Sequence, residues 1–247
     1  MEQIIQEFYG FSKSKILKIK KDNNFFVRKF ENIQRNIERY EVLKEFDISM
    51  PKILKIEKNY YDMEFIESID MIKFVSFYDI DLLLEFLKNI FNTLKHVTVL
   101  KNYINTYEEK LNYCDFSFLV FKKYELIEKL PDTIPQTIYH GDLTLDNILY
   151  NTEKQKFFLI DPITSVYDSY VFDLAKLNQD LICGWHSRKH ANKHENKINY
   201  LFKKLSEIYP ELNNNYILIL MLLRVLPYCD NDQDKSFLLK WINKLWI

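Results

Sequence analysis

Two short segments of this chain contain the residue types that phosphoryl transfer requires. Residues 140–147 read H-G-D-L-T-L-D-N, and residues 158–162 read F-L-I-D-P. Asp142 is a carboxylate that could orient a substrate hydroxyl and accept its proton. Asn147 and Asp161 offer the hard oxygen ligands that Mg²⁺ prefers. One base and two metal ligands suit transfer of a nucleotide's terminal phosphoryl group, because that reaction depends mainly on positioning and charge neutralisation. A loop aspartate that caps a helix is the alternative interpretation of Asp142.

Composition limits the class of protein. The chain has 247 residues, 47% of them hydrophobic, which is enough for one domain or two small lobes with a sizeable core. The formal net charge of −1 gives no general basic field, so we expect no nucleic-acid partner. The longest apolar run, residues 216–223, is far shorter than the roughly 20 residues of a membrane span, so it predicts a buried helix.

The cysteines and the N-terminus favour a cytoplasmic protein. Cys114, Cys183 and Cys229 are far apart and odd in number, which does not fit a disulfide framework and favours a reducing compartment. The first residues, M-E-Q-I-I-Q-E, lack the basic and apolar regions of a signal peptide.

The N-terminal region predicts a small sheet with one helix. Apolar patterning indicates strands within residues 14–30, joined by a turn at 21–24. Helical spacing of apolar residues follows at 31–46, and Pro51 cannot continue that helix. Two further strands are expected at 52–56 and 61–66.

The remainder predicts mostly helix. Residues 79–97 are strongly periodic, and residues 107–130 are interpreted as one helix that Pro131 stops. The H-G-D segment then precedes a short strand pair at 148–150 and 157–160, and further helix follows to the end.

With a β-rich region upstream, the H-G-D-x-x-x-x-N and I-D-P segments resemble the aminoglycoside phosphotransferase and choline kinase family. The resemblance runs from about Gly10 to about Leu177. It implies an α+β, two-lobed protein-kinase-like fold: residues 1–68 as a small antiparallel β lobe with one helix, and residues 69–247 as a larger, mostly helical lobe. It also implies ATP and Mg²⁺ as cofactors, with GTP an open alternative as donor.

The resemblance implies a lysine that contacts the nucleotide phosphates. Strand alternation puts Arg28 and Lys29 on opposite faces, and the resemblance selects Lys29. A solvated surface lysine is the alternative. A phosphate-binding lysine of this kind needs a carboxylate on the following helix, and Glu38 and Glu41 are both candidates.

Further nucleotide contacts are implied at the entry to the first strand and at the end of the last. Gly10, Ser12 and Ser14 could cover the phosphates through backbone N–H groups and hydroxyls. An ordinary strand-entry turn explains the same residues. The backbone of Glu64 and Ile66 would meet the purine edge, although a plain buried strand is also compatible with this sequence.

Supporting roles are implied for two residues around the H-G-D segment. Asp173, followed by Leu174 and Ala175, matches an acid that supports the catalytic loop, with Asp168 as a companion; both could instead begin a helix. His140 is interpreted as a scaffold whose ring fixes the loop, and Asp146 as a solvated residue.

The sequence leaves the phosphate acceptor open. The family phosphorylates aminoglycosides, amino alcohols such as choline, sugars and related compounds, so the partner expected is a small-molecule acceptor. An aromatic cage with acids would suit a cationic amine. The residues that could form it are Tyr167, Tyr170, Trp185, Tyr228, Asp230, Asp232 and Asp234.

A row of histidines offers a different chemistry. His186, His190 and His194 have the i, i+4, i+8 spacing of one helical face, which could bind zinc. Their basic neighbours, Arg188 and Lys189 among them, favour a solvated or anion-contacting surface instead.

Three functions are therefore weighed. The leading one is a magnesium-dependent kinase of a small hydroxyl-bearing molecule, with Asp142 as base. The alternative is a catalytically weak nucleotide-binding module that regulates a partner. The lack of a G-x-G-x-x-G loop favours this alternative. The third is a structural zinc protein that uses the histidine row.

Overall fold

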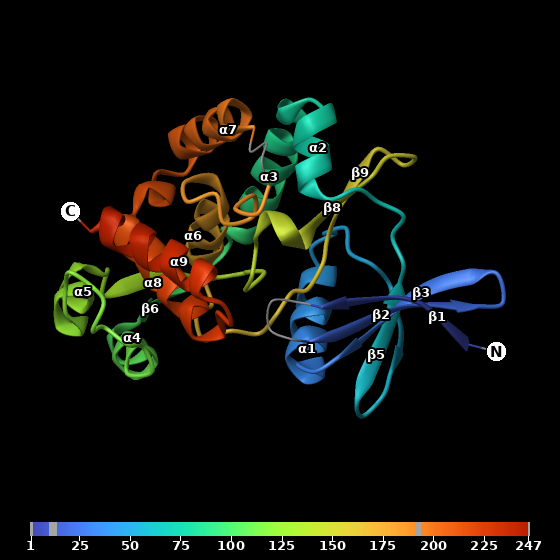
Figure 1. Ribbon diagram of the computed structural model, residues 1–247, viewed down its shortest axis with the longest axis horizontal. Helices are drawn as coiled ribbons and strands as arrows, with labels where there is room; N and C mark the ends of the chain where they lie inside the picture. Colours follow the sequence, from blue (N-terminus) through green and yellow to red (C-terminus); the bar gives the residue numbers. More distant parts are fainter. Residues whose placement is uncertain (1, 10–13, 191–193, 247) are drawn as a thin grey trace. The chain divides into compact units, whose positions relative to one another are not determined.

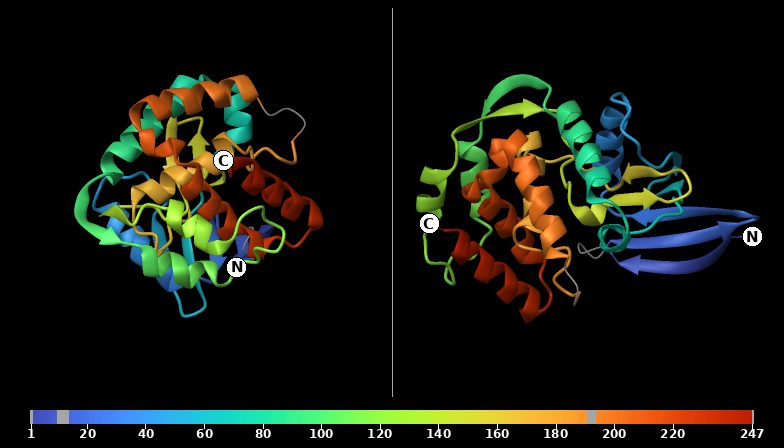
Figure 2. Two further views of the ribbon diagram at one scale, coloured as in Figure 1. Left: turned by 90° about the vertical axis from the view of Figure 1, so that its left-hand side faces the viewer. Right: turned by 90° about the horizontal axis from the view of Figure 1, so that it is seen from above.

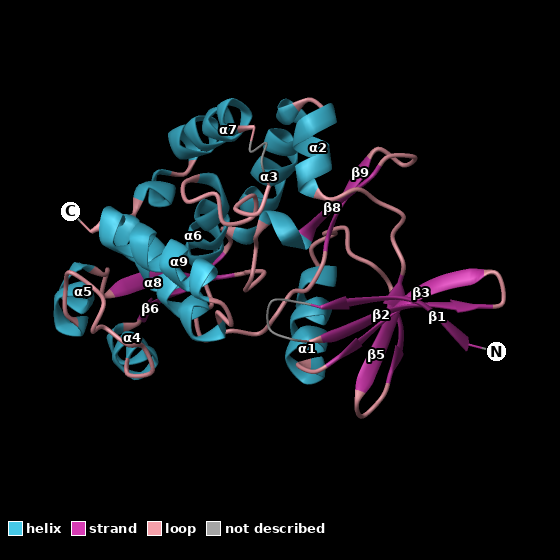
Figure 3. Ribbon diagram, viewed as in Figure 1, coloured by secondary structure: helices cyan, strands magenta, loops and turns pink. Residues whose placement is uncertain are grey.

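The computed structural model describes residues 2–9, 14–190 and 194–246. The chain divides into two compact units. Unit 1 contains Met1–Phe74 and Asp146–Thr164, and unit 2 contains Val75–Leu145 and Ser165–Ile247. Strands predominate in unit 1 and helices in unit 2 (Figure 3). The predicted division into residues 1–68 and 69–247 stays a prediction.

Unit 1 is built on an antiparallel sheet that, among the described residues, has five strands in the order β1-β2-β3-β5-β4 (Figure 1). The strands are β1 (Glu2–Tyr9), β2 (Lys15–Lys21), β3 (Asn24–Phe30), β4 (Ile53–Ile56) and β5 (Tyr60–Glu64). The β2–β3 turn contains Asp22 at a left-handed φ of 55°. Leu17, Ile19 and Phe26 form a buried cluster. Helix α1 (Ile33–Lys44) follows β3.

The second segment of unit 1 is a hairpin anchored to the first. It begins within the 3₁₀ turn η1 (Leu145–Asn147) and contains β8 (Ile148–Asn151) and β9 (Lys156–Leu159). The N–H of Leu159 donates to the carbonyl of Ser49 at 2.8 Å, and Tyr150 pairs with Ile69. The rings of Phe74, Tyr150 and Phe157 lie within 5.0 Å of one another between centroids. These contacts fix the residues on either side of the hairpin, Asn147 and Asp161.

Unit 2 is mostly helical and is centred on α6 (Tyr170–Leu181), every residue of which is buried. It packs against α7 (Glu195–Ile208) and α8 (Asn215–Val225), and α8 packs in turn against α9 (Asp232–Leu245) (Figures 1 and 2). Because α6 is enclosed, its polar residues have to find partners inside the protein.

The outer elements of unit 2 complete the helical layer. α2 (Met71–Phe77) joins the two units along the chain, and α3 (Ile80–Leu94) packs against α7. The strands β6 (Val97–Asn102) and β7 (Thr133–Thr137) form a ribbon, with α4 (Ile104–Leu111) and α5 (Lys123–Lys129) between them in sequence. The turns η2 (Pro210–Asn213) and η3 (Leu226–Tyr228) precede and follow α8. In the described part of the chain, no helix has both the length and the hydropathy of a membrane span.

Several elements differ from those predicted: α2, β6 and β7 were not expected, and the predicted helix 79–97 ends at Leu94. Residues 107–130 are not one helix: α4 ends at Leu111, and the Asp115 carboxylate accepts the N–H of Ser117 at 2.9 Å in a local turn before α5. Strand β1 was not expected, because Ile4 and Ile5 are adjacent and break the alternation of a strand. A register shift between Ile4 and Gln6 accommodates that pair.

Candidate active site

The loop that carries Asp142 is held by carboxylates of α6. Asp173 is buried and accepts the backbone N–H groups of His140 at 2.5 Å, Gly141 at 2.9 Å and Leu143 at 3.4 Å. Gly141 has a φ of 92°, which side-chain-bearing residues rarely adopt. Burial raises the pKa of Asp173 to about 6, although the N–H donors oppose that shift. Asp173 therefore carries charge near neutral pH and fixes the loop backbone on both sides of Asp142.

A second carboxylate of α6, Asp180, holds the other end of the loop. Its Oδ2 accepts the N–H of Leu145 at 2.7 Å, and its Oδ1 accepts the N–H of His186 at 3.0 Å. One buried side chain thus connects the Asp142 loop to the turn that follows α6. Asp180 was not predicted from the sequence, although its spacing of seven from Asp173 places both on one helical face.

Lys176, on the same face of α6, forms an ion pair with Asp142. Lys176 Nζ lies 2.9 Å from Asp142 Oδ1, and the two side chains are 9% and 40% exposed. Burial alone would raise the pKa of Asp142, but the nearby Lys176 and Arg224 outweigh it and hold that pKa below its ordinary value. Asp142 is therefore ionised at neutral pH, as a base must be. Lys176 was not predicted from the sequence either, although its spacing of three from Asp173 places the two residues on one helical face.

His140 and Asp168 lie in supporting positions of unit 2. His140 is fully buried, and its Nδ1 accepts the N–H of Asp142 at 3.4 Å. Asp168 accepts hydrogen bonds from Lys101 at 2.8 Å, Tyr103 at 2.6 Å and Gln136 at 2.5 Å. Asp168 thus connects Lys101 of β6 and Gln136 of β7 to the start of α6, because the next residue, Ser169, caps that helix.

We expect Asp173→Ala to destabilise the protein by about 3 kcal/mol, because it leaves several buried N–H groups without an acceptor. Denaturant unfolding followed by circular dichroism measures this change. The exposed Asp146 provides the matched control: Asp146→Ala should change the free energy of unfolding by less than about 0.5 kcal/mol. Equal effects of the two substitutions would contradict the role given to Asp173.

The pH dependence of turnover should report the Lys176–Asp142 pair. The pKa of Asp142 is lowered from its ordinary value of 3.8, so its carboxylate stays ionised until the pH falls through that lowered pKa. Turnover that needs the ionised base should be lost over the same pH range. We expect the acid limb of the kcat profile below pH 4. Lys176→Met should move that limb to higher pH, since it removes a cation that favours the carboxylate. An unchanged limb would show that Asp142 does not govern it.

In unit 1, Lys29 lies on β3 and is buried. Its Nζ lies 2.7 Å from Asp161 Oδ1. Arg28, on the opposite face, donates to Asp62 at 2.7 and 2.9 Å. The structure thus separates the two basic side chains of β3 and turns Lys29 toward the residue expected to bind the metal.

The glutamates expected to partner Lys29 lie elsewhere. Glu38 is exposed and accepts a hydrogen bond from Gln34 at 2.9 Å, and Glu41 is exposed and lies 3.6 Å from Lys44. The buried face of α1 consists of Asn36, Arg39 and Leu43. The structure corrects the expectation for a physical reason: the face of α1 that packs inward carries no carboxylate, and Asp161 takes that place.

Helix α1 instead contacts the segment after Asp161. Asn36 Nδ2 donates to the carbonyl of Pro162 at 2.7 Å. The Arg35 side chain donates to the Thr164 carbonyl at 2.6 and 3.0 Å, and the Thr164 N–H donates to the Arg35 carbonyl at 3.0 Å. These bonds hold the backbone on the C-terminal side of Asp161.

Asn147 and Asp161 are adjacent across the hairpin. Ile148 pairs with Leu159, and the N–H of Ile160 donates to the carbonyl of Asn147 at 3.0 Å. Asp161 has a left-handed φ of 59°, a conformation that aspartate tolerates better than most residues. The hairpin thus places an amide and a carboxylate at its two ends, and both are residue types with the hard oxygen ligands that Mg²⁺ prefers.

The other predicted nucleotide contacts have ordinary structural partners. Gly10 and Ser12 lie outside the described residues. Ser14 is buried, and its Oγ lies 3.4 Å from Glu31 Oε2. The N–H of Glu64 donates to the carbonyl of Lys52 at 2.8 Å, and the carbonyl of Ile66 accepts the hydroxyl of Ser68 at 3.1 Å. A purine would have to use the remaining backbone groups of 64–66.

The histidine row does not form one helical face. His186 lies in a turn, and His194 is the left-handed residue that precedes α7, with Nε2 2.8 Å from the hydroxyl of Ser76. Across residues 2–9, 14–190 and 194–246, no group of three or more His, Cys, Asp or Glu side chains could hold a metal ion. The premise of the zinc hypothesis, a continuous helix through 186–194, is therefore wrong.

Comparison with known proteins agrees with this architecture. The model of the phosphotransferase enzyme family matches residues 11–191. No curated protein matches the sequence. A thermostable mutant of the aminoglycoside phosphotransferase APH(4)-Ia is similar in structure, with a TM-score of 0.70 and 10% identity over 99% of this chain and 94% of that one.

Two further solved structures have the same fold. A ternary complex of APH(4)-Ia with ADP and hygromycin B has a TM-score of 0.67 and 9% identity over 97% of this chain and 92% of that one. The ethanolamine kinase of Plasmodium vivax has a TM-score of 0.55 and 16% identity over 100% of this chain and 82% of that one. With the family model covering most of the sequence, this chain belongs to the phosphotransferase enzyme family and has the α+β protein-kinase-like fold predicted for it.

Proposed function

We propose that this protein transfers the γ-phosphoryl group of ATP, with Mg²⁺, to a hydroxyl group of a small molecule. The observation that carries the proposal is the state of Asp142. Its carboxylate is partly exposed and is kept ionised by Lys176. Asp142 lies in a loop whose backbone N–H groups are held by Asp173 and Asp180. A base held in this way is suited to orienting an acceptor hydroxyl.

The residues of unit 1 suit the binding of a nucleotide. Lys29 would bind the α- and β-phosphates, and Asn147 and Asp161 would hold the metal, whose charge neutralises the triphosphate. The solved complex of a related fold with ADP and hygromycin B supports a nucleotide donor and a small-molecule acceptor. The ethanolamine kinase supports an alcohol as acceptor.

Asp142 would accept the hydroxyl proton as the new P–O bond forms. The new bond joins the acceptor oxygen to the γ-phosphorus, the bond to the β-γ bridging oxygen breaks, and ADP leaves. Lys176 keeps the Asp142 carboxylate charged before the reaction. Asp173 and Asp180 keep the loop backbone from moving as the proton arrives.

The test is transfer itself. Purified protein, ATP and Mg²⁺ are incubated with alcohols, sugars and amino alcohols, and ³¹P NMR identifies any new phosphate ester. We expect an ester that appears only with Mg²⁺. Nucleotide binding without ester formation or ATP hydrolysis would overturn the proposal and favour the regulatory module considered from the sequence.

A further inference from the structure

Two of the four aromatic side chains that could have formed a cage for a cationic acceptor, Tyr167 and Trp185, already contact the protein's own cations. Arg224 Cζ lies 4.6 Å from the ring centroid of Tyr167, and Arg188 Cζ lies 3.6 Å from that of Trp185. A guanidinium over an aromatic face is a favourable cation–π contact. An amine that sought either face would have to displace it.

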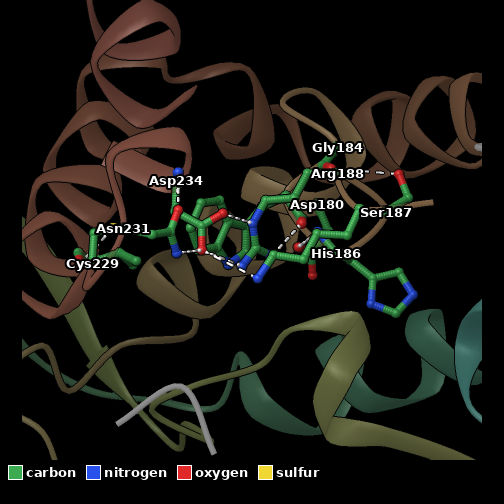
Figure 4. Close-up of polar contacts among 11 residues, drawn as sticks. Asp180, Gly184, His186, Ser187, Arg188, Cys229, Asn231 and Asp234 are labelled. Atoms are coloured by element: carbon green, nitrogen blue, oxygen red, sulfur yellow. Dashed lines mark hydrogen bonds and ion pairs between the residues drawn. The ribbon is translucent and has the colours of Figure 1, made fainter. Parts of the chain in front are cut away.

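The acid nearest to Trp185 in this arrangement is neutralised as well. Arg188 donates to both oxygens of Asp234, from Nε at 2.7 Å and from Nη2 at 3.1 Å, and Lys189 Nζ lies 3.5 Å away (Figure 4). The Arg188 hydrogen bonds hold the pKa of Asp234 well below its usual range. The Asp234 side chain is only 5% exposed. Asp234 therefore offers little to an incoming cation.

This arrangement is attached to the catalytic loop. Asp180 accepts the N–H of His186, in the turn that carries Arg188 (Figure 4). It also accepts the N–H of Leu145, so this turn is fixed to the loop that carries Asp142. Asp180 itself is buried and faces these backbone groups. Asp180 therefore adds no exposed negative charge near the Asp142 loop.

Beside Asp142 itself, cations predominate. Lys176 Nζ lies 2.9 Å from Asp142, and Arg224 is close enough to influence it electrostatically. Asp173 and Asp180, the carboxylates of α6 that hold the loop, are directed at backbone N–H groups. The Asp142 carboxylate, which would meet the acceptor hydroxyl, therefore has two basic side chains as its electrostatic neighbours.

Resting on the proposed phosphotransferase function, we propose that the acceptor carries an anionic group, a phosphate or a carboxylate, near the hydroxyl that is phosphorylated, and that Lys176 and Arg224 bind this group. The planar guanidinium of Arg224 matches the paired oxygens of either anion. The ammonium of Lys176 has donors beyond the one that Asp142 accepts. Both side chains thus give specificity for an anion beside the base.

The first experiment compares acceptors that share one carbon skeleton. Glycerol is set beside glycerol 3-phosphate, glycerate and 3-amino-1,2-propanediol, and glucose beside glucose 6-phosphate, gluconate and glucosamine. We expect kcat/KM for an anionic member to exceed that of its neutral and cationic counterparts by about tenfold or more. The phosphate and carboxylate members show which anion is preferred. Preference for a neutral or cationic member would overturn the proposal.

The second experiment does not depend on turnover. Binding of sulfate to protein loaded with Mg²⁺ and AMP-PNP is measured by calorimetry for wild type, Lys176→Met and Arg224→Met. We expect saturable binding that either substitution weakens about fivefold or more. The control, Lys101→Met, removes a lysine from the ion pair with Asp168 and should bind sulfate as wild type does. Absence of saturable binding, or equal weakening by all three substitutions, would overturn the proposal.

Two outcomes separate anion binding from a role of Lys176 in positioning Asp142 alone. Anion binding predicts that Lys176→Met raises KM for the anionic acceptor and that Lys176→Arg restores it. A positioning role predicts an equal loss of kcat for every acceptor and unchanged sulfate binding, which would contradict the inference. Because sulfate binding needs no phosphoryl transfer, its result stands even if the protein proves not to be a kinase.

Discussion

Asp142→Asn should lower kcat by about 100- to 10,000-fold, because the amide cannot take the acceptor's proton. The side chain keeps its size, and the loop backbone keeps its bonds to Asp173 and Asp180. Nucleotide affinity should stay within about twofold of wild type, since no role in nucleotide binding is proposed for this residue. A coupled assay of ADP release gives kcat, and calorimetry with AMP-PNP gives the affinity.

Asp146→Asn is the matched control for this substitution. Asp146 lies in the same loop, four residues later, and is exposed. It should retain kcat within about twofold of wild type. If Asp142→Asn also retained most of its turnover, Asp142 would not be the base, and the proposed reaction would lose its central residue.

Asp161→Asn should abolish most turnover for a different reason. A neutral amide in place of the carboxylate weakens the hold on the metal, whose charge stabilises the reacting phosphates by several kcal/mol, equivalent to roughly 100- to 10,000-fold in kcat. The concentration of Mg²⁺ that gives half-maximal rate should rise as well. Asp142→Asn should leave that concentration unchanged, so the Mg²⁺ titration distinguishes the two substitutions.

Asp47→Asn provides the backbone control. Asp47 is exposed and, like Asp161, has a left-handed φ, in this case 54°. Replacing it tests whether an Asp-to-Asn change in that conformation disturbs unit 1 by itself. Loss of rate in both variants would point to backbone disturbance rather than to metal binding.

The sequence predicted the parts of this molecule that local chemistry determines. The strands around the 21–24 turn and the hairpin at 148–160 follow from alternation and turn residues within a few positions. Asn147 and Asp161 are adjacent because that hairpin brings its two ends together. The fold was predicted from the resemblance of the H-G-D-x-x-x-x-N and I-D-P segments to a known family.

Contacts that depend on how a helix is rotated about its axis could not be predicted from local sequence patterns. Glu38 and Glu41 were considered as partners of Lys29, yet packing turns Asn36, Arg39 and Leu43 inward. Apolar periodicity does not predict which polar residues of an amphipathic helix are buried. Burying a polar side chain such as Asn36 or Arg39 costs free energy unless it finds hydrogen-bond partners, and those partners lie outside the helix. Tertiary contacts with Pro162 and Thr164 decide the rotation.

The sequence contains a signal for Lys176 and Asp180, the two residues of α6 that were not predicted. They follow the predicted Asp173 at i+3 and i+7, the spacing of one helical face. Charged residues on a buried helix need partners, and here the partners are the loop backbone and Asp142. The contact of Arg224 with Tyr167 had no such signal, because it joins residues distant in sequence. Arg188 lies only three residues after Trp185, but in a turn, where helical periodicity predicts no contact.

The Lys29–Asp161 ion pair has a thermodynamic consequence for loading the enzyme. In the proposed reaction, the Lys29 ammonium and Mg²⁺ would compete for the Asp161 carboxylate, so Mg²⁺ on its own would have to displace Lys29 from a contact of 2.7 Å. Triphosphate oxygens would give Lys29 another anion to contact and release Asp161 for the metal. The two ligands would then be linked reciprocally: each would raise the affinity for the other by the same factor, and free Mg²⁺ would bind more weakly than Mg²⁺ that arrives with ATP.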